Sequence, residues 1–169
     1  MTPFEEYLNR YLDLIPSENW LEEMKSVTKQ TLELYQSFSE DKGNFAYAEG
    51  KWSLKTLLEH LIDTEKIFTY RALCFVRKDT TELPGFDEEL YAQNGTAHCR
   101  TLPDLIEEFR LNRQLSYLFF SKLNMEQLVC EGKANGNVFS VETIGKWIVA
   151  HNIHHTQIVK ERYLPKMQM

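Results

Sequence analysis

The sequence is poor in cysteine, and its three cysteines form no recognisable motif. Cys74, Cys99 and Cys130 are odd in number, far apart, and include no Cys-x-x-Cys pair. A framework of structural disulfides and a cysteine-based metal site are therefore both unexpected. This usage is typical of a reduced protein, and we expect a cytoplasmic location.

Long hydrophobic runs and clusters of positive charge are also missing. No apolar stretch approaches the roughly 20 residues that a membrane-spanning helix needs, and the first residues lack the basic and apolar blocks of a signal peptide. The formal net charge is −6, with Lys and Arg scattered along the chain. Because binding to nucleic-acid backbones needs a basic surface, we expect neither membranes nor nucleic acids as partners.

Glycine-rich functional motifs are absent too. The 7 glycines form no phosphate-binding loop, no dinucleotide-binding pattern and no Gly-x-Ser-x-Gly turn around a nucleophilic serine. These absences exclude the commonest nucleotide-binding and serine-hydrolase signatures, so the chemistry has to come from other side chains.

Helical periodicity is what the sequence does contain. With 169 residues, of which 43% are hydrophobic, we expect one domain covering residues 1–169. Apolar spacing predicts a short extra N-terminal helix and four long helices, at residues 3–15, 17–38, 54–77, 101–123 and 140–163. Four long helices without a convincing strand pair indicate an all-α, antiparallel four-helix bundle.

Two connections carry turn residues. Residues 78–101 contain Pro84-Gly85 and Asn94-Gly95, and a loop of this length is usually functional or holds a short helix of its own; residues 87–93 are that candidate helix. Residues 125–129 suit one further helical turn. Residues 131–139 form a loop or a small hairpin, because Asn-Gly suits a tight turn.

Three of the five histidines fall within residues 151–155, inside the last predicted helix. At about 100° per residue, His151 and His155 share the face that bears Ile144 and Ile148. Side chains at i and i+4 are close enough to share one divalent metal. His154 competes with His155 as the partner of His151, and spacing does not decide between them. His60 is the candidate third ligand.

The sequence supplies no obvious general base beside these histidines. In a His-Glu-x-x-His zinc helix the glutamate has this role, but Asn152 stands at that position here. The carboxylates near His60, at Glu59, Asp63 and Glu65, do not clearly fill the gap. Glu59 and Asp63 are equally expected to be solvated charges. No catalytic residue is therefore assigned.

Three further side chains are candidates for contacts with a substrate. Arg71 could bind an anionic group, but it lies about 16 Å along its helix from His60, and an ion pair with Asp87 or Glu88 is the role we expect. Tyr91 and Asn135 could line the mouth of a site, although a structural role is expected for each.

Several blocks of the sequence resemble the DinB-like (DinB/YfiT) superfamily. They cover nearly the whole chain, in the family's order and spacing: GKWS at 50–53, LEHLIDTEKIFTYRAL at 58–73, LPGFDEELY at 83–91, EGKANGNVFSV at 131–141, AHNIHH at 150–155 and ERY at 161–163. The resemblance implies an up-down-down-up four-helix bundle, often a homodimer. It also implies a divalent metal held by His60, His151 and His155, which leaves His154 as a spare.

The resemblance leaves the reaction open. It implies a metal-dependent enzyme of the thiol S-transferase or hydrolase type that acts on a small molecule, in some relatives with a low-molecular-weight thiol as cosubstrate. Three imidazoles suit zinc or nickel first, and also iron or manganese. The alternative is a metal-binding stress or scaffold dimer that catalyses nothing; a site closed by a fourth protein ligand would favour it.

Overall fold

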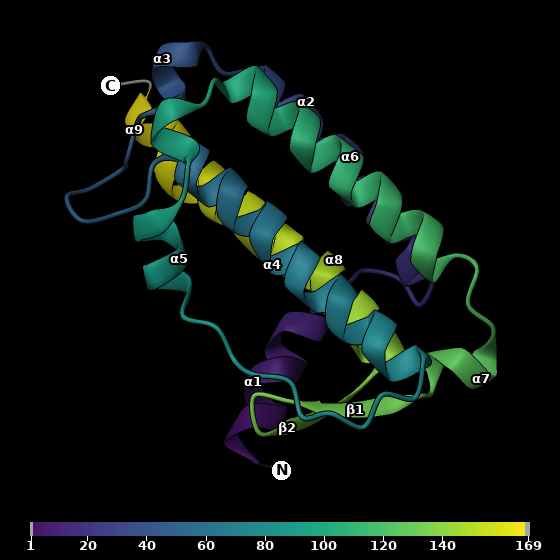
Figure 1. Cartoon of the computed structure of the whole chain (residues 1–169). Helices are drawn as coiled ribbons and strands as arrows, with labels where there is room; N and C mark the ends of the chain where they lie inside the picture. Colours follow the sequence, from purple (N-terminus) through teal and green to yellow (C-terminus); the bar gives the residue numbers. More distant parts are fainter. Residues whose placement is uncertain (1, 168–169) are drawn as a thin grey trace.

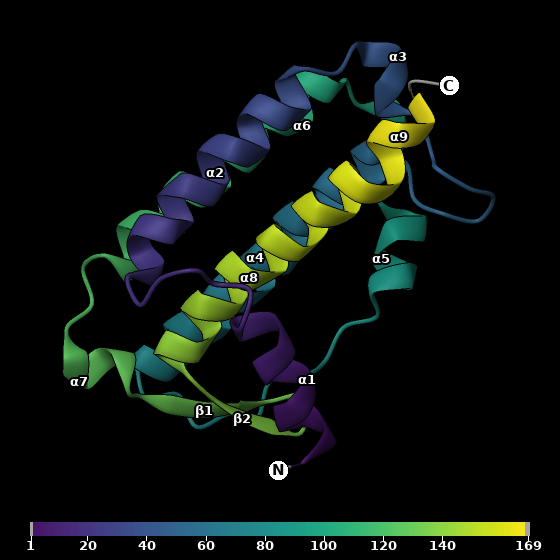
Figure 2. The ribbon, with the colours of Figure 1, turned by 180° about the vertical axis from the view of Figure 1, so that it is seen from behind.

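Four long helices lie side by side along most of the length of the molecule (Figures 1 and 2). The computed structural model describes residues 2–167 of the chain. The four helices are α2 (Trp20–Gln36), α4 (Leu54–Val76), α6 (Leu102–Phe120) and α8 (Val141–Ile158). All four were predicted from the apolar spacing. The ends of α2, α4 and α6 lie within a few residues of the predicted boundaries, whereas the end of α8 differs.

Each long helix begins at a polar side chain that caps it. The side chains of Asn19, Ser53, Thr101 and Ser140 accept hydrogen bonds from backbone amides in the first turn of their helices. Such a cap satisfies one of the amides that has no partner inside the helix. Ser53 and Thr101 are residue types preferred at this position, and they mark the starts predicted for α4 and α6.

The helices run up, down, down and up, as the resemblance implied. The ion pair of Glu65 with Arg113 and the hydrogen bond between Thr69 and Ser116 follow the same order along α4 and α6, so these two helices are parallel. Helices α2 and α8 run the opposite way (Figure 1). The predicted all-α four-helix bundle is confirmed.

The parallel pair explains the long connection between α4 and α6. Because both helices begin at the same end, the chain must return along the bundle before α6 starts. This segment contains the helix α5 (Glu88–Asn94), as predicted, and the short helix η1 (Ala97–Cys99). The return path brings residues 83–88 beside α4.

A small antiparallel hairpin lies between α6 and α8. Its strands are β1 (Glu131–Ala134) and β2 (Asn137–Ser140). Asn135 and Gly136 have φ values of 50° and 75°, the left-handed conformation that a two-residue hairpin turn requires and that Asn and Gly tolerate. Of the two alternatives for residues 131–139, the hairpin is therefore the correct one.

Three short helices complete the ends of the bundle. The N-terminal helix α1 (Pro3–Leu12) packs against α8, and it ends three residues before the predicted boundary. The turn predicted at residues 125–129 is α7 (Met125–Leu128). The helix α3 (Glu40–Gly43) was not expected, because four residues are too few for a periodic pattern.

The last helix was predicted to end at residue 163, and that boundary is wrong. After α8, residues Val159–Tyr163 form the π-helical segment η2, and α9 (Leu164–Met167) continues beyond it with Pro165 in its first turn. Pro165 has no N–H to donate to the preceding turn. The π-helical segment directly before α9 changes the hydrogen-bond spacing at this point of the helix.

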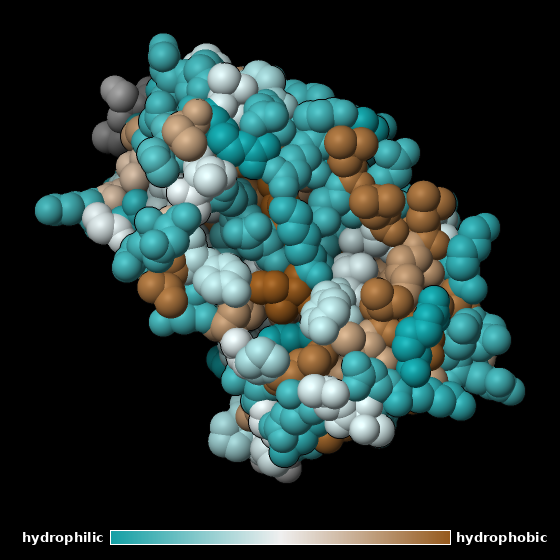
Figure 3. Space-filling model, in the orientation of Figure 1, coloured by the Kyte–Doolittle hydropathy of each residue, from teal (hydrophilic) through white to brown (hydrophobic). Residues whose placement is uncertain are grey.

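The surface differs between the two ends of the bundle. Figure 3 shows mostly hydrophilic residues around α3 and α5, and hydrophobic residues over α6 and towards the hairpin end. Exposed leucines on α6 include Leu111, Leu115 and Leu118.

Cys74, Cys99 and Cys130 are free thiols. None of the described helices is long and apolar enough to cross a membrane.

Candidate metal centre and its cavity

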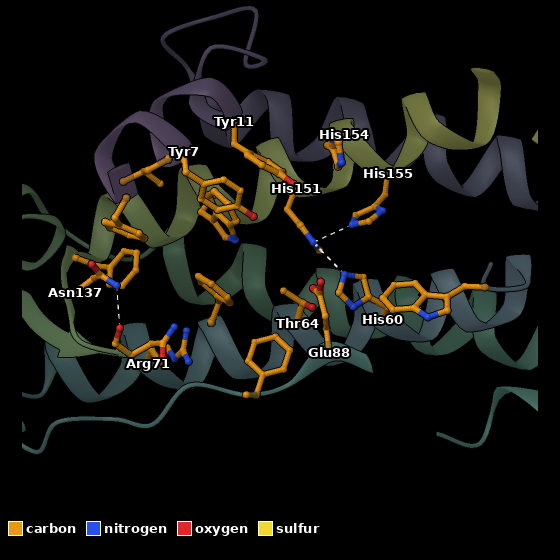
Figure 4. A pocket seen from close by; sticks show the side chains of 18 residues that line it. Tyr7, Tyr11, His60, Thr64, Arg71, Glu88, Asn137, His151, His154 and His155 are labelled. Carbon is orange, nitrogen blue, oxygen red and sulfur yellow. Dashed lines mark hydrogen bonds between the residues drawn. The ribbon is translucent and has the colours of Figure 1, made fainter. Parts of the chain in front are cut away.

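The three histidines chosen from the sequence meet between α4 and α8 (Figure 4). His60 lies in the second turn of α4, and His151 and His155 are one turn apart on α8. The Nε2 atom of His151 is 3.1 Å from Nε2 of His60 and 3.0 Å from Nε2 of His155. Three imidazole nitrogens from two facing helices thus converge on one point.

Burial keeps these imidazoles neutral at pH 7. It lowers the pKa of His60 to about 4, and with two neighbouring histidines it lowers the pKa of His155 to about 3. The pKa of His151 is also lowered, first by burial and then by His155 and His60. Since a metal takes the lone pair of a neutral imidazole, little proton displacement is needed for binding at pH 7.

The spacing fits one divalent metal ion. In a tetrahedral site with metal–nitrogen bonds of 2.0–2.1 Å, two ligand nitrogens are about 3.3 Å apart, close to the two Nε2 distances of 3.0 and 3.1 Å. Among residues 2–167, no fourth His, Cys, Asp or Glu joins this group of ligand atoms. The arrangement is the open type, with three protein ligands and room for another.

The structure also separates His155 from its competitor. His154 is not in the group of three; its ring packs on Tyr11 instead, with 4.9 Å between ring centroids. His98 lies in η1 and is exposed. The sequence left the partner of His151 open, and the side-chain geometry places His155 there.

The open side of the histidine cluster faces a cavity of about 370 Å³ (Figure 4). Its walls are mainly aromatic, and α1, α4, the residues before α5, the hairpin and α8 all contribute to them. The lining residues are Phe4, Tyr7, Leu8, Tyr11, Trp52, His60, Thr64, Phe68, Arg71, Phe86, Glu88, Asn135, Asn137, Phe139, Trp147, His151, His154 and His155.

The contribution of α1 was not predicted. Phe4, Tyr7, Leu8 and Tyr11 repeat at helical spacing and cover the cavity from one side. The sequence signal was present as an apolar stripe on a short helix, but such a stripe usually indicates core packing and does not reveal a cavity wall. Burial raises the pKa of Tyr11, so its hydroxyl remains protonated and can donate a hydrogen bond.

Glu88 is the one carboxylate among the described residues that line this cavity. It is the first residue of α5, and Figure 4 shows it beside Thr64 and near His60. Burial raises the pKa of its carboxyl. The sequence suggested Glu88 only as a partner for Arg71, because the path of residues 78–101 past the histidines could not be read from the chain.

The ion pair expected between Arg71 and Asp87 or Glu88 is not formed. Arg71 lines the cavity at the end away from the histidines (Figure 4), and its Nη2 donates to the carbonyl oxygen of Pro84 at 2.8 Å. Asp87 caps α5, where its Oδ1 accepts from the backbone amides of Glu89 and Leu90. The segment around Pro84 therefore supplies a carbonyl where a carboxylate was expected.

Two of the three carboxylates near His60, Glu59 and Glu65, are buried structural groups. The expectation of a solvated charge is therefore wrong for Glu59. Glu59 accepts from the amide and hydroxyl of Thr96 at 2.9 and 2.7 Å and from the amide of Ala97 at 3.1 Å, which fixes η1. Glu65 pairs with Arg113 at 2.9 Å. Asp63 is half-buried, with Lys66 as its nearest cation at 3.9 Å.

Asn152 belongs to a polar network on the opposite side of α8 from the cavity. Its Oδ1 accepts from Nη2 of Arg113 at 3.1 Å, and its Nδ2 donates to the hydroxyls of Thr31 and Thr156. The side chain is fully buried. Asn152 thus joins α8 to α2 and α6.

Of the two residues suggested for the mouth of the site, one is found there. Asn135 lines the cavity from the hairpin turn. Tyr91 lies outside the lining and packs on Phe86, with 5.3 Å between ring centroids. Gly85 allows the hairpin to approach, because a Cβ there would lie 2.3 Å from Oδ1 of Asn135.

Comparison with known proteins agrees with this architecture. The family model described as the DinB superfamily matches residues 23–159, which include all three histidines and leave α1 outside. A protein of Oceanobacillus iheyensis named "Putative metal-dependent hydrolase OB0413" is 22% identical over 143 residues, 82% of each chain.

A solved structure shares the fold. YfiT from Bacillus subtilis, described as "a probable metal-dependent hydrolase with an unusual four-helix bundle topology", superposes with a TM-score of 0.69 at 16% identity. The match covers 98% of this chain and 89% of YfiT. It therefore includes α1, which the family model does not reach.

Proposed function

This chain belongs to the DinB superfamily, and from that membership and the histidine cluster we propose that it is a divalent-metal-dependent enzyme acting on a small molecule. Its reaction is hydrolysis or transfer to a low-molecular-weight thiol. His60, His151 and His155 are the proposed ligands. Zinc or nickel suits three neutral imidazoles best, and iron or manganese is compatible with them.

One observation carries this proposal: the three Nε2 atoms converge at the wall of a cavity, with no fourth protein ligand among the described residues. A metal in such a site lowers the pKa of a bound water to about 7, or holds a thiol as its thiolate. A structural site is usually closed by four protein ligands. The open geometry therefore favours the enzyme over the scaffold.

The surrounding side chains have separate tasks in this proposal. The aromatic walls exclude water and hold an apolar part of the substrate. Glu88, whose carboxyl has a raised pKa, accepts the proton that the attacking water or thiol releases. Thr64 lines the cavity beside Glu88 and forms part of the wall that faces the substrate.

The first test is metal content. Protein purified without a histidine tag is expected to contain about one divalent metal per chain, and His60→Ala and His155→Ala are expected to lose it. His154→Ala is the matched control, because it removes an imidazole next to the cluster but not in it. Unchanged metal content in both ligand variants contradicts the site assignment.

The second test concerns the reaction. A screen of thiols such as bacillithiol, mycothiol and glutathione against electrophiles, run beside a panel of esters and amides, separates transferase from hydrolase activity. Turnover that stops with chelator and returns with zinc supports the enzyme. If the metal-loaded protein shows no turnover, and X-ray absorption shows four protein ligands on the metal, the scaffold is favoured.

We also propose a cytoplasmic homodimer. The homodimer rests on the family resemblance, and the location rests on the three free thiols. Light scattering after size-exclusion chromatography measures the mass directly. A mass near 40 kDa supports the dimer, and a mass near the 20.0 kDa of one chain contradicts it.

A further inference from the structure

Arg71 lies at the end of the cavity opposite the metal centre (Figure 4). It shares one face of α4 with His60, Thr64 and Phe68, all of which line the cavity. Eleven residues separate His60 from Arg71, which corresponds to about 16 Å along the helix axis. The cavity is therefore elongated, with neutral imidazoles at one end and a guanidinium at the other.

The charge of Arg71 is not balanced. The residue is 4% exposed, and none of the salt bridges among residues 2–167 includes it. The guanidinium has five N–H donors, and within the described part of the chain it makes one hydrogen bond, to the carbonyl oxygen of Pro84. The guanidinium also lies over Phe68, 4.9 Å from the ring centroid. Burial lowers the pKa of Arg71, with no neighbouring charge opposing it.

The surroundings of Arg71 do not supply the missing negative charge. Asn135 and Asn137 are the polar neighbours in the lining at this end, and both are neutral. Glu88 lies at the other end, beside Thr64 (Figure 4). Since a buried charge is normally paired, and since the free donors belong to a cavity wall, a ligand is the expected partner.

The middle of the cavity is apolar. Phe68, Phe86 and Trp147 form much of this part of the wall. A ligand with an apolar body and few polar groups matches these walls.

We propose that the substrate is a small carboxylate whose anionic group binds Arg71 while its reacting group lies at the three histidines. The planar guanidinium matches a carboxylate with two parallel hydrogen bonds. One positive charge balances one negative charge, which favours a carboxylate over a doubly charged phosphate. This inference rests on the proposed function for its reacting end, but Arg71 can be tested without any metal.

The test compares octanoate with octanamide, which differ in charge but hardly in size. Titration calorimetry of metal-free protein is expected to show octanoate binding at least about tenfold more tightly, the typical strength of one charge-assisted hydrogen bond. Arg71→Gln is expected to abolish the preference, and Arg71→Lys to keep part of it. The control Arg77→Gln, which removes an exposed positive charge from the end of the same helix, is expected to change nothing.

A second arm separates this inference from the metal proposal. Zinc-loaded protein is titrated with 8-mercaptooctanoate, which is expected to bind more tightly than octanoate, and His60→Ala is expected to remove that gain. If zinc-loaded wild-type protein binds 8-mercaptooctanoate no more tightly than octanoate, but still prefers octanoate to octanamide, the metal site is overturned and the carboxylate site stands. Equal binding of octanoate and octanamide, or a preference that survives in a folded Arg71→Gln protein, overturns the carboxylate site.

Discussion

Two buried arginines show how the two sides of this bundle differ. Arg113, on α6, is 3% exposed and is paired with Glu65, with further hydrogen bonds to Thr28 and Asn152. Arg71, on α4, is 4% exposed, and its one hydrogen-bond partner among residues 2–167 is the carbonyl oxygen of Pro84. The two side chains are buried to the same extent, but only Arg113 has a carboxylate partner within the described residues.

The difference indicates what each side of the molecule is built to do. Charges in the network around Arg113 are satisfied within the protein, so that network holds α2, α4, α6 and α8 together. In the cavity, Arg71 and the histidines keep free donors or lone pairs, which is the condition for binding a ligand. Substitutions in the network should therefore reduce stability, and substitutions in the cavity should reduce binding.

The largest expected effect is on stability. Arg113→Met leaves the buried carboxylate of Glu65 without its partner, and breaking one side of a buried pair costs about 3–5 kcal/mol. Arg71→Met leaves no charge unpaired, so its free energy of unfolding should stay within about 1 kcal/mol of the wild type. Urea unfolding of both variants checks this. Equal destabilisation by the two substitutions would remove the distinction between the two sides.

The next effect is on metal affinity. His60→Ala removes one of the three proposed ligands and should weaken zinc binding by about 100- to 1000-fold, or about 3–4 kcal/mol. The free energy of unfolding of the metal-free protein should change little, because the imidazole that is removed is a buried polar group with a lowered pKa. Competition with a chromogenic chelator measures the affinity. His154→Ala should stay within about threefold of the wild type; a larger loss would make His154 a ligand.

The third effect is a dependence on pH. The pKa values of His60 and His155 are about 4 and 3 in the folded protein and about 6.5 when unfolded. Because the folded values are lower, the stabilisation is complete above pH 6.5 and is lost as the pH falls. Between pH 7 and 5, metal-free protein should lose about 2 kcal/mol for each histidine. Urea unfolding of His60→Leu should show a weaker slope, and an unchanged slope would contradict the buried neutral state.

The smallest effect concerns Asn152. Asn152→Ala removes three buried hydrogen bonds and should cost about 1–3 kcal/mol. Zinc affinity should remain within about threefold of the wild type, because the side chain lies on the network side of α8. A variant of normal stability that fails to bind zinc would assign Asn152 to the metal centre instead.

Much of the fold could be predicted because it depends on local patterns. Apolar spacing and the caps at Ser53 and Thr101 determine where helices form, and Asn135-Gly136 determines the hairpin turn. The end of the last helix, predicted at residue 163, is wrong, because the π-helical segment η2 depends on hydrogen-bond spacing that composition does not reveal.

The candidate site could be predicted only in part. Helical spacing brings His151 and His155 together within one helix, and the family blocks indicated His60. The remaining cavity residues depend on how distant segments pack. Helix α1 covers the site, and the return path of residues 78–101 brings Glu88 to the histidines and Pro84 to Arg71. The roles of Glu59 and Glu65 also depend on partners that lie far away in the sequence.

The central claim is an open metal site on three histidines, and X-ray absorption at the zinc edge tests it most directly. Tag-free, zinc-loaded protein should show three imidazole nitrogens at about 2.0–2.1 Å and at least one light-atom ligand that 8-mercaptooctanoate replaces with sulfur at about 2.3 Å. His60→Ala should lose one imidazole. Four protein ligands that no thiol displaces, or a spectrum unchanged in His60→Ala, would contradict the account.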